Sequence, residues 1–433
     1  MTHQEKINTL RNYDVFAALP QSVQDFLSVK AEELHISFQE LKILTDMAAD
    51  LEMWGTSGLP ALWNEENTGH LKGRNRKQAV LDRTHRAYLE LKETPPDYTS
   101  FTGGPAPVLP IEYRSVEHDG ALLGRCPVAG VRTRCCNLQT LDAVQQCGFA
   151  CSYCSIQSFY DEGRVYFIRN LREKLRGLRL EPDQLYHIGT GQSSDSLMWG
   201  NREGLLDTLF EFASENANVI LELKTKSANI RYLLDHDIPP NVLTTWSLNT
   251  QTIIANEEHL TAPLQERLSA AAAVAGKGGL VGFHFHPIVR YKGWQEEYSR
   301  IYQHIQEHFR PSQAAMISIG TLTYIKPVIR LLRTQQFKSR ILQMPLEDAA
   351  GKLSYPFDVK LEMFTHAYRS FSAEWHNGVF FYMCMEDPRL WQPVFGREYA
   401  SNEEFEKDMK NSYMKKIIGL RQNAVKHRRR TVK

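Results

Sequence analysis

The sequence lacks long hydrophobic stretches and any surplus of charge. No run of about eighteen uncharged apolar residues occurs, which excludes a membrane-spanning helix. Its 51 Lys and Arg residues balance 50 Asp and Glu residues, for a net charge of +1. A molecule this neutral has no strong general attraction to nucleic acid or to a membrane, so any such attraction must come from a local patch. The polar segment Met1–Leu10 lacks the apolar core of a signal peptide, and no signal peptide is expected.

Cysteine is scarce and unevenly placed. The chain has seven cysteines, an odd number, and most of them fall between Cys135 and Cys154. A secreted disulfide framework would spread its cysteines more widely. We therefore expect a protein of the reducing cytoplasm, with clustered thiols that hold a metal and with no membrane partner.

Residues 1–110 are expected to form a helical N-terminal extension and a linker. Asp25–Leu51 and Arg74–Leu91 repeat apolar residues at roughly helical spacing. Thr94–Pro110 is rich in Pro and Gly, which interrupt helices and strands. We interpret the helices as an extension that packs on the core; a domain that covers the substrate is the alternative.

Residues 111–330 are expected to form an α/β fold, a partial (β/α)6-type TIM barrel. Short apolar runs alternate there with amphipathic stretches, which is typical of parallel strands joined by helical crossovers. In such barrels the reactive residues sit at the C-terminal ends of the strands. The expected strands are Asp142–Gln146, Leu185–Gly189, Val219–Leu223, Val242–Leu248, Leu280–Ile288 and Ala315–Ile319.

Residues 331–433 are expected to form a mixed C-terminal segment with a basic tail. Gly378–Met385 has the composition of a buried strand, and Glu403–Leu420 that of a helix. A basic tail can bind the phosphates of a nucleic acid, although such tails are commonly only solvated. Its basic residues are Arg421, Lys426, His427, Arg428, Arg429, Arg430 and Lys433.

The strongest chemical signal is the loop Cys147-Gly-Phe-Ala-Cys151-Ser-Tyr-Cys154, a CxxxCxxC spacing. Three thiolates on one short loop can ligate three irons of a [4Fe–4S] cluster. The fourth iron then has no protein ligand and can chelate the amino and carboxylate groups of S-adenosylmethionine (SAM). One electron from such a cluster breaks the sulfonium C–S bond and gives methionine and a 5′-deoxyadenosyl radical, while the protein supplies position and shielding.

Two plainer interpretations of the loop stay open. A zinc site would need a fourth Cys or His at matching spacing, and the adjacent Cys135 and Cys136 are poorly placed to bind one tetrahedral ion together. Three cysteines that only fill core space would rarely fall within so short a loop. Tyr153, directly before the last Cys, can stack or hydrogen-bond at the adenine end of SAM, or simply pack the loop.

The order of motifs resembles the spore photoproduct lyase family of the radical SAM superfamily, whose members reverse a thymine dimer in DNA. The resemblance covers roughly residues 140–330, less than half of the chain. Its motifs stand at strand ends or in the turns that follow them. They are Cys147–Gln157, Gly189–Asp195, Leu223–Lys226, Trp246–Asn249, Pro263–Arg267, Gly282–Ile288 and Gly293–Tyr298.

This resemblance implies a set of SAM-binding residues. Ser194 and Lys226 match positions that contact SAM, and a lysine at a strand end suits the SAM carboxylate. Ser247 and Asn249 match polar positions of the same pocket, although each, taken alone, is an ordinary polar residue. The resemblance also implies an electron donor such as a flavodoxin or a ferredoxin.

The sequence departs from the family where hydrogen is returned to the substrate. By this resemblance, the repair enzymes carry a hydrogen-donating Cys at the position where this chain has Gln192. They also carry a Tyr at the position where this chain has Ser155. The stretch that meets DNA corresponds to Lys352–Pro356, which is barely basic. We therefore expect an enzyme that makes the same radical and abstracts hydrogen from a different, unidentified substrate. A DNA photolesion lyase and a non-catalytic metal- or nucleic-acid-binding protein are the alternatives.

Other thiols could replace the missing hydrogen donor. Cys126, Cys135 and Cys136 lie upstream of the cysteine loop, and inert buried thiols are the default interpretation for them. Cys384 is expected in a core strand, with a donor role as its alternative. We take Cys136, together with Tyr153, as the catalytic candidates.

Two imidazoles and two carboxylates complete the candidates. His284 and His286 alternate along an expected strand, so both point to one face of it. They could bind an anion, shuttle protons, ligate a metal or form a structural pair. Glu222 and Asp195 stand near strand ends and are candidates for positioning a substrate.

Overall fold

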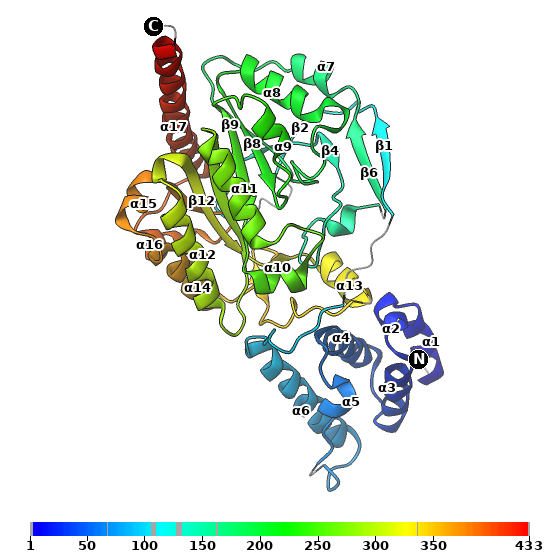
Figure 1. The fold of residues 1–433 in the computed structure, drawn as a ribbon. Helices are drawn as coiled ribbons and strands as arrows, with labels where there is room; N and C mark the ends of the chain where they lie inside the picture. Colours follow the sequence, from blue (N-terminus) through cyan, green and yellow to red (C-terminus); the bar gives the residue numbers. More distant parts are fainter. Residues whose placement is uncertain are drawn as a thin grey trace.

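An eight-stranded sheet forms the centre of the computed structural model. The structure describes residues 3–66, 68–104, 110–126, 132–161, 163–335 and 337–431. The strand order of the sheet is β16-β12-β11-β9-β8-β7-β3-β2, and every neighbouring pair is parallel except β2 with β3. The sheet curls into a half-barrel with helices on its outer side (Figure 1). The predicted fold class, a partial α/β barrel, is confirmed.

The central parallel strands lie close to their predicted positions. All of β9 and nearly all of β11 are buried, as expected for parallel strands covered on both faces. These strands are β7 (Tyr186–Thr190), β8 (Val219–Thr225), β9 (Val242–Ser247), β11 (Leu280–Ile288) and β12 (Ala314–Thr321). The helices between them are α7 (Leu171–Arg176), α8 (Leu205–Glu215), α9 (Arg231–Asp235), α10 (Gln251–Glu257), α11 (Leu264–Gly276) and α12 (Trp294–His308).

The first and last barrel strands differ from the prediction. The first parallel strand is β3 (Gln139–Leu141), flanked by the edge strand β2 (Leu123–Arg125), and not the predicted Asp142–Gln146. Part of that predicted strand, β4 (Val144–Gln145), pairs instead in a small separate sheet, whose other strands are β1 (Glu112–Val116) and β6 (Arg164–Ile168).

At the other edge, the apolar run Gly378–Met385 forms β16 (Phe380–Met383), which pairs in parallel with β12. The barrel sheet therefore continues past residue 330, beyond the boundary that the sequence predicts there.

The N-terminal helices form a lobe beside the open end of the barrel (Figure 1). They pack on it through α13 (Lys326–Thr334), whose Arg333 pairs with Asp46 and with the buried Asp50, both at 2.8 Å. The lobe consists of α1 (His3–Arg11), α2 (Asp14–Ala18), α3 (Gln21–Glu33), α4 (Phe38–Trp54), α5 (Gly58–Leu62) and α6 (Gly73–Glu93).

The C-terminal segment closes the barrel and ends in one long helix. A hairpin of β14 (Glu347–Ala349) and β15 (Lys352–Ser354) pairs with β13 (Thr323–Tyr324) at the barrel opening. The helices are α14 (Phe357–Arg369), α15 (Ala373–Gly378), α16 (Trp391–Phe395) and α17 (Asn402–Thr431). The basic tail belongs to α17, but its side chains beyond residue 422 lie outside those described. In the described ranges no helix is both long and apolar enough to cross a bilayer.

Candidate active site

One cavity of about 950 Å³ opens at the C-terminal ends of the barrel strands. Residues that end or follow β7, β8, β9, β11, β12 and β16 line it, which is where the barrel architecture predicts reactive groups. Its volume lies at the upper end of the range of about 300–1,000 Å³ that ligand pockets span.

The three thiols of the cysteine loop all line this cavity. Cys151 lies in β5 (Ala150–Cys151), which pairs with β10 (Glu258–His259), and the Cys154 N–H donates to the Cys151 carbonyl at 3.1 Å. Burial raises the pKa of all three thiols, to about 12 for Cys151, and the nearby Lys226 opposes this rise at Cys151 and Cys154.

The cysteine loop supplies the three thiolates that a [4Fe–4S] cluster with one open iron takes from a protein. Among the described residues, no three Cys, His, Asp or Glu side chains stand close enough together to hold one metal ion. In a [4Fe–4S] cluster each thiolate binds a different iron, so its ligands stand farther apart. None of the seven cysteines forms a disulfide. The predicted zinc alternative therefore finds no ligand set in the described part of the chain.

A buried carboxylate, Glu257, anchors the cysteine loop. The Ser152 hydroxyl donates to it at 2.5 Å, and the hydroxyls of Tyr98 and Ser339 donate at 2.7 and 2.6 Å. The Ser152 N–H also donates to the Glu257 carbonyl at 2.8 Å. One side chain thus ties the loop to the linker and to the C-terminal segment. No sequence signal points to it, because its partners are far apart along the chain.

Tyr153 lines the cavity with its ring and directs its hydroxyl to the buried Glu258. Glu258 in turn pairs with Arg267 at 2.6 Å, and both carry almost no exposed surface. Burial and the Glu258 charge hold the Tyr153 pKa well above its usual value. The phenol is therefore neutral and committed to the loop, while its ring faces the cavity.

Lys226 follows β8 and presents an ammonium group to the cavity. Asp195 fixes this strand end, because it accepts the Thr225 hydroxyl at 2.7 Å and the Lys226 N–H at 2.6 Å. Asp195 is thus a positioning residue. Within the described part of the chain, the ammonium of Lys226 makes no hydrogen bond or ion pair, and its titratable neighbours include the loop thiols Cys151 and Cys154.

The two predicted serines reach the cavity, whereas Asn249 does not. The Ser194 hydroxyl donates to the Gln146 carbonyl at 2.8 Å and accepts from Trp199 Nε1 at 2.9 Å, and Ser247 ends β9 beside His284.

Asn249 lies behind the cavity wall and has its hydrogen-bonding capacity engaged. Its amide donates to Glu258 at 3.3 Å and to the Pro287 carbonyl at 3.2 Å, and its oxygen accepts from Tyr298 at 2.5 Å. The structure therefore gives Asn249 a bracing position instead of the predicted pocket-lining one.

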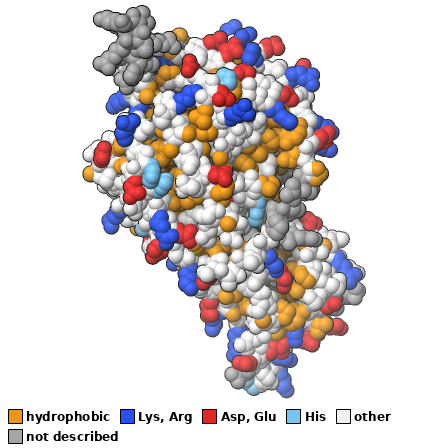
Figure 2. All heavy atoms as spheres, in the orientation of Figure 1, with side chains coloured by type: hydrophobic (Ala, Val, Ile, Leu, Met, Phe, Trp, Pro, Cys, Tyr) orange, Lys and Arg blue, Asp and Glu red, His pale blue; other side chains and the backbone are white. Residues whose placement is uncertain are grey.

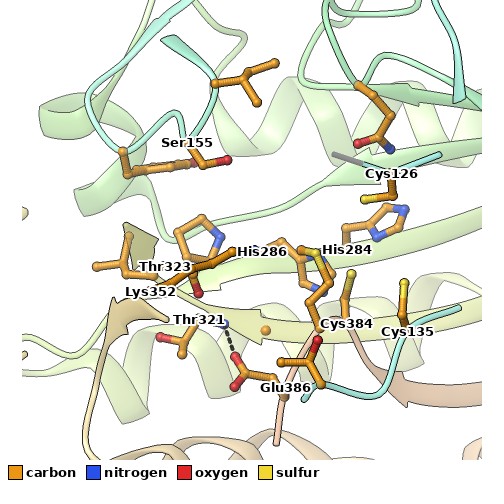
Figure 3. Close-up of a pocket in the computed structure, with 18 of the residues that line it drawn as sticks. Cys126, Cys135, Ser155, His284, His286, Thr321, Thr323, Lys352, Cys384 and Glu386 are labelled. Carbon is orange, nitrogen blue, oxygen red and sulfur yellow. Dashed lines mark hydrogen bonds between the residues drawn. The ribbon is translucent and has the colours of Figure 1, made fainter. Parts of the chain in front are cut away.

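A second group of thiols lines another part of the cavity wall. Cys136 is buried between the thiols of Cys135 and Cys384, with Cys126 nearby, and all four line the cavity. Figure 3 shows Cys126, Cys135 and Cys384 on the side of His284, away from Ser155. Both positions that depart from the family pattern, Gln192 and Ser155, also line the cavity.

Glu222 lies at the inner end of the cavity and binds two imidazoles. His187 and His284 approach its two oxygens at 2.8 and 2.6 Å, and the Thr245 hydroxyl donates at 2.8 Å. Burial opposes ionisation of Glu222, but these partners outweigh it and hold its pKa well below the usual value.

The predicted same-face placement of His284 and His286 is confirmed, since both line the cavity with ring centroids 5.4 Å apart. Burial lowers the pKa of both rings, to about 4 for His284, so both are neutral near pH 7.

Comparison with known proteins identifies relatives of the barrel. Residues 146–354 match the family model described as spore photoproduct lyase. The spore photoproduct lyase of Clostridium acetobutylicum is 24% identical over 229 residues, which cover 50% of this chain and 64% of the relative. That of Bacillus subtilis is 34% identical over 83 residues, 19% of this chain and 24% of the relative. The matches thus span less than two thirds of either relative.

Solved structures agree. A spore photoproduct lyase double mutant with bound AdoMet and dinucleoside spore photoproduct superposes with a TM-score of 0.53 at 18% identity, covering 62% of this chain and 81% of that chain. A spore photoproduct lyase complexed with dinucleoside spore photoproduct gives 0.53 at 18% identity, with 63% and 82% covered. At this identity the likeness establishes the half-barrel fold, and together with the family match it confirms the predicted resemblance.

Proposed function

We propose that this chain, whose residues 146–354 form a spore photoproduct lyase-like domain of the radical SAM superfamily, is a radical SAM enzyme. The observation that carries the proposal is the meeting, in one cavity at the strand ends, of three thiols and a lysine ammonium that forms no ion pair with any described residue. The cluster ligands are Cys147, Cys151 and Cys154, and the residues around SAM are Tyr153, Ser194, Lys226 and Ser247, with Asn249 bracing them from behind.

When bound, the cluster supplies the electron that cleaves SAM to methionine and a 5′-deoxyadenosyl radical. The chain's own residues bind SAM and shield the radical. Lys226 pairs with the SAM carboxylate, Tyr153 closes the wall beside the cluster loop, and Asp195 holds the Lys226 backbone in place. The buried walls keep water away from a radical that would otherwise react with its surroundings.

We propose a substrate other than a DNA photolesion. The exposed charged residues that line the cavity are two acids, Glu347 and Asp348, and two bases, Arg132 and Arg389. A duplex-binding entrance needs a clear excess of positive charge. The face drawn in Figure 2 likewise mixes both signs without a continuous basic field. A DNA photolesion lyase is the second candidate, favoured by the family match and by relatives solved with dinucleoside spore photoproduct.

The second thiol group supports hydrogen return by a cysteine. Cys136 is the catalytic candidate, because its thiol contacts those of Cys135 and Cys384 at the cavity wall. A thiol can give a hydrogen atom to a carbon radical, and the thiyl radical left behind must then be restored by a further hydrogen atom or electron.

The proposal includes partners and a compartment. An electron donor such as a flavodoxin or a ferredoxin delivers the electron, and the basic end of α17 offers a nucleic-acid contact. Seven cysteines without a disulfide support a reducing, cytoplasmic setting.

Anaerobic reconstitution separates these candidates. A radical SAM enzyme takes up about four irons and makes 5′-deoxyadenosine from SAM under dithionite. A photolesion lyase would also bind UV-damaged duplex tightly, with an affinity that falls as salt is added. A colourless protein that retains zinc and makes no 5′-deoxyadenosine would overturn the proposal and favour a non-catalytic binding protein.

A further inference from the structure

We propose that Lys224 binds an anionic group of the substrate, a carboxylate or a phosphate, in the inner part of the cavity. The inference rests on the proposed function, because it specifies the substrate of the same site. The sequence motif Leu223–Lys226 draws attention to Lys226, but its other lysine, Lys224, also lines the cavity, as do Lys352 and Lys360.

The two ammonium groups serve different parts of the cavity. Side chains alternate along β8, so Lys224 shares the inward face with Glu222, whose partners His187 and His284 line the cavity. The charged and titratable neighbours of Lys224 include Glu222, Lys226, the imidazoles of His284 and His286, and two thiols of the second group, Cys126 and Cys384. Lys226 instead lies among the cluster thiols, Glu258 and Arg267.

The Lys224 ammonium has no counter-ion at contact distance. Among the described residues, none forms a hydrogen bond or an ion pair with it. Its carboxylate neighbour Glu222 is already engaged, because both Glu222 oxygens accept hydrogen bonds from other residues. Burial without a partner is costly for an ammonium group. An anion that enters this part of the cavity removes that cost.

Two neighbouring imidazoles and one neighbouring lysine do not compete for the anion. Burial and the Lys224 charge itself lower the pKa of His284 and His286, so the two rings carry no charge near pH 7. The buried Lys360 is already paired with Glu386 at 2.7 Å. Lys352 also has Cys126 and Cys384 among its neighbours, and of these two lysines Lys224 is the one that shares the inward face of β8 with Glu222.

The position of Lys224 also orients the substrate. Figure 3 shows Cys126 and Cys384 around the space beside His284 and His286. An anion held there places the attached carbon skeleton between the cluster loop, where hydrogen is taken, and the thiols that could return it.

Calorimetric titration of the reconstituted protein, with SAM present and no reductant, tests this inference. SAM occupies the Lys226 side, and the probes are acetate and inorganic phosphate. We expect one of the two anions to bind, which identifies the group, and the K224M substitution to weaken binding at least about tenfold. K224R should retain binding because it keeps the charge, and K326M is the matched control at an exposed lysine that does not line the cavity, expected to bind like the unmodified protein.

Three results would overturn the inference: no binding of either anion, equal binding by K224M, or loss of binding in K226M but not in K224M. Equal thermal unfolding temperatures of K224M and the unmodified protein show that K224M is folded. If K224M is not folded, anion binding is compared between K224R and the unmodified protein instead. The titration involves no turnover, so its result does not depend on the formation of 5′-deoxyadenosine. Failure to form 5′-deoxyadenosine would therefore count against the proposed function alone, and the anion affinity would still test the role of Lys224.

Discussion

The ammonium nitrogen of Lys226 lies 5.6 Å from the centroid of the Tyr153 ring. This separation is within the range of about 6 Å over which a cation and an aromatic face attract each other. Tyr153 directly precedes the proposed cluster ligand Cys154, and Lys226 follows the strand whose end is proposed to bind SAM. The contact therefore joins the cysteine loop to the residue that is proposed to hold the SAM carboxylate.

Replacement of Lys226 by Met should weaken SAM binding without loss of iron. A hydrogen bond to a charged group is worth about 1.5–3 kcal/mol, which corresponds to a loss of roughly tenfold to a hundredfold in affinity. The SAM dissociation constant of the reconstituted protein measures this, with K352M as the control. An unchanged dissociation constant would remove Lys226 from the SAM site.

Replacement of Glu257 by Ala should destabilise the whole chain and loosen the cluster loop. The substitution leaves buried hydroxyl donors of Tyr98, Ser152 and Ser339 without an acceptor, at a cost of about 3 kcal/mol or more in the free energy of unfolding. Urea denaturation measures the loss, and the exposed Glu266 replaced by Ala is the matched control. Equal stability of the two variants would contradict the anchoring role.

Asn249 and Ser247 should respond oppositely to truncation. N249A is expected to lower the free energy of unfolding by about 1–3 kcal/mol, since it removes a buried amide with three partners. Its SAM affinity should change little. S247A should keep its stability and lose SAM affinity, because Ser247 faces the cavity. Should N249A keep its stability and lose SAM affinity, the amide would belong to the pocket after all.

Sequence patterns within a short segment predicted those parts of the fold that depend on that segment alone. The predicted strand Leu280–Ile288 is observed as β11 with the same bounds, and its two histidines lie on one face as alternation requires. The spacing of the cysteine loop likewise sufficed to predict that Cys147, Cys151 and Cys154 would meet at one cavity.

Long-range pairing could not be predicted in the same way. Ser152 and Glu257 are 105 residues apart, and no periodicity reports such a contact. Phe380–Met383 joins the sheet by pairing with β12 at its edge, and the sequence of this segment does not indicate which strand it pairs with. Lys224 could have been recognised, because it stands two residues before Lys226 and alternation places both on the inward face.

Acid should destabilise the protein partly through His284. Burial lowers its pKa from 6.5 to about 4, so the unfolded chain binds a proton more readily than the folded one between these values. The free energy of unfolding therefore falls as pH drops through this window, by about 2 kcal/mol between pH 7 and pH 5 from this ring. Urea denaturation at the two pH values should show a smaller loss for H284Q. A pH dependence identical in both proteins would contradict the buried neutral imidazole.

The most direct test of the central claim is the iron content and EPR spectrum of the anaerobically reconstituted protein, before and after addition of SAM. We predict about four irons per chain in one cubane, with a reduced signal that SAM changes because it binds the open iron. Alanine at Cys147, Cys151 or Cys154 should abolish the signal, whereas alanine at Cys126 should leave it. A protein without a cubane, or one whose cubane survives loss of these three thiols, would contradict the claim.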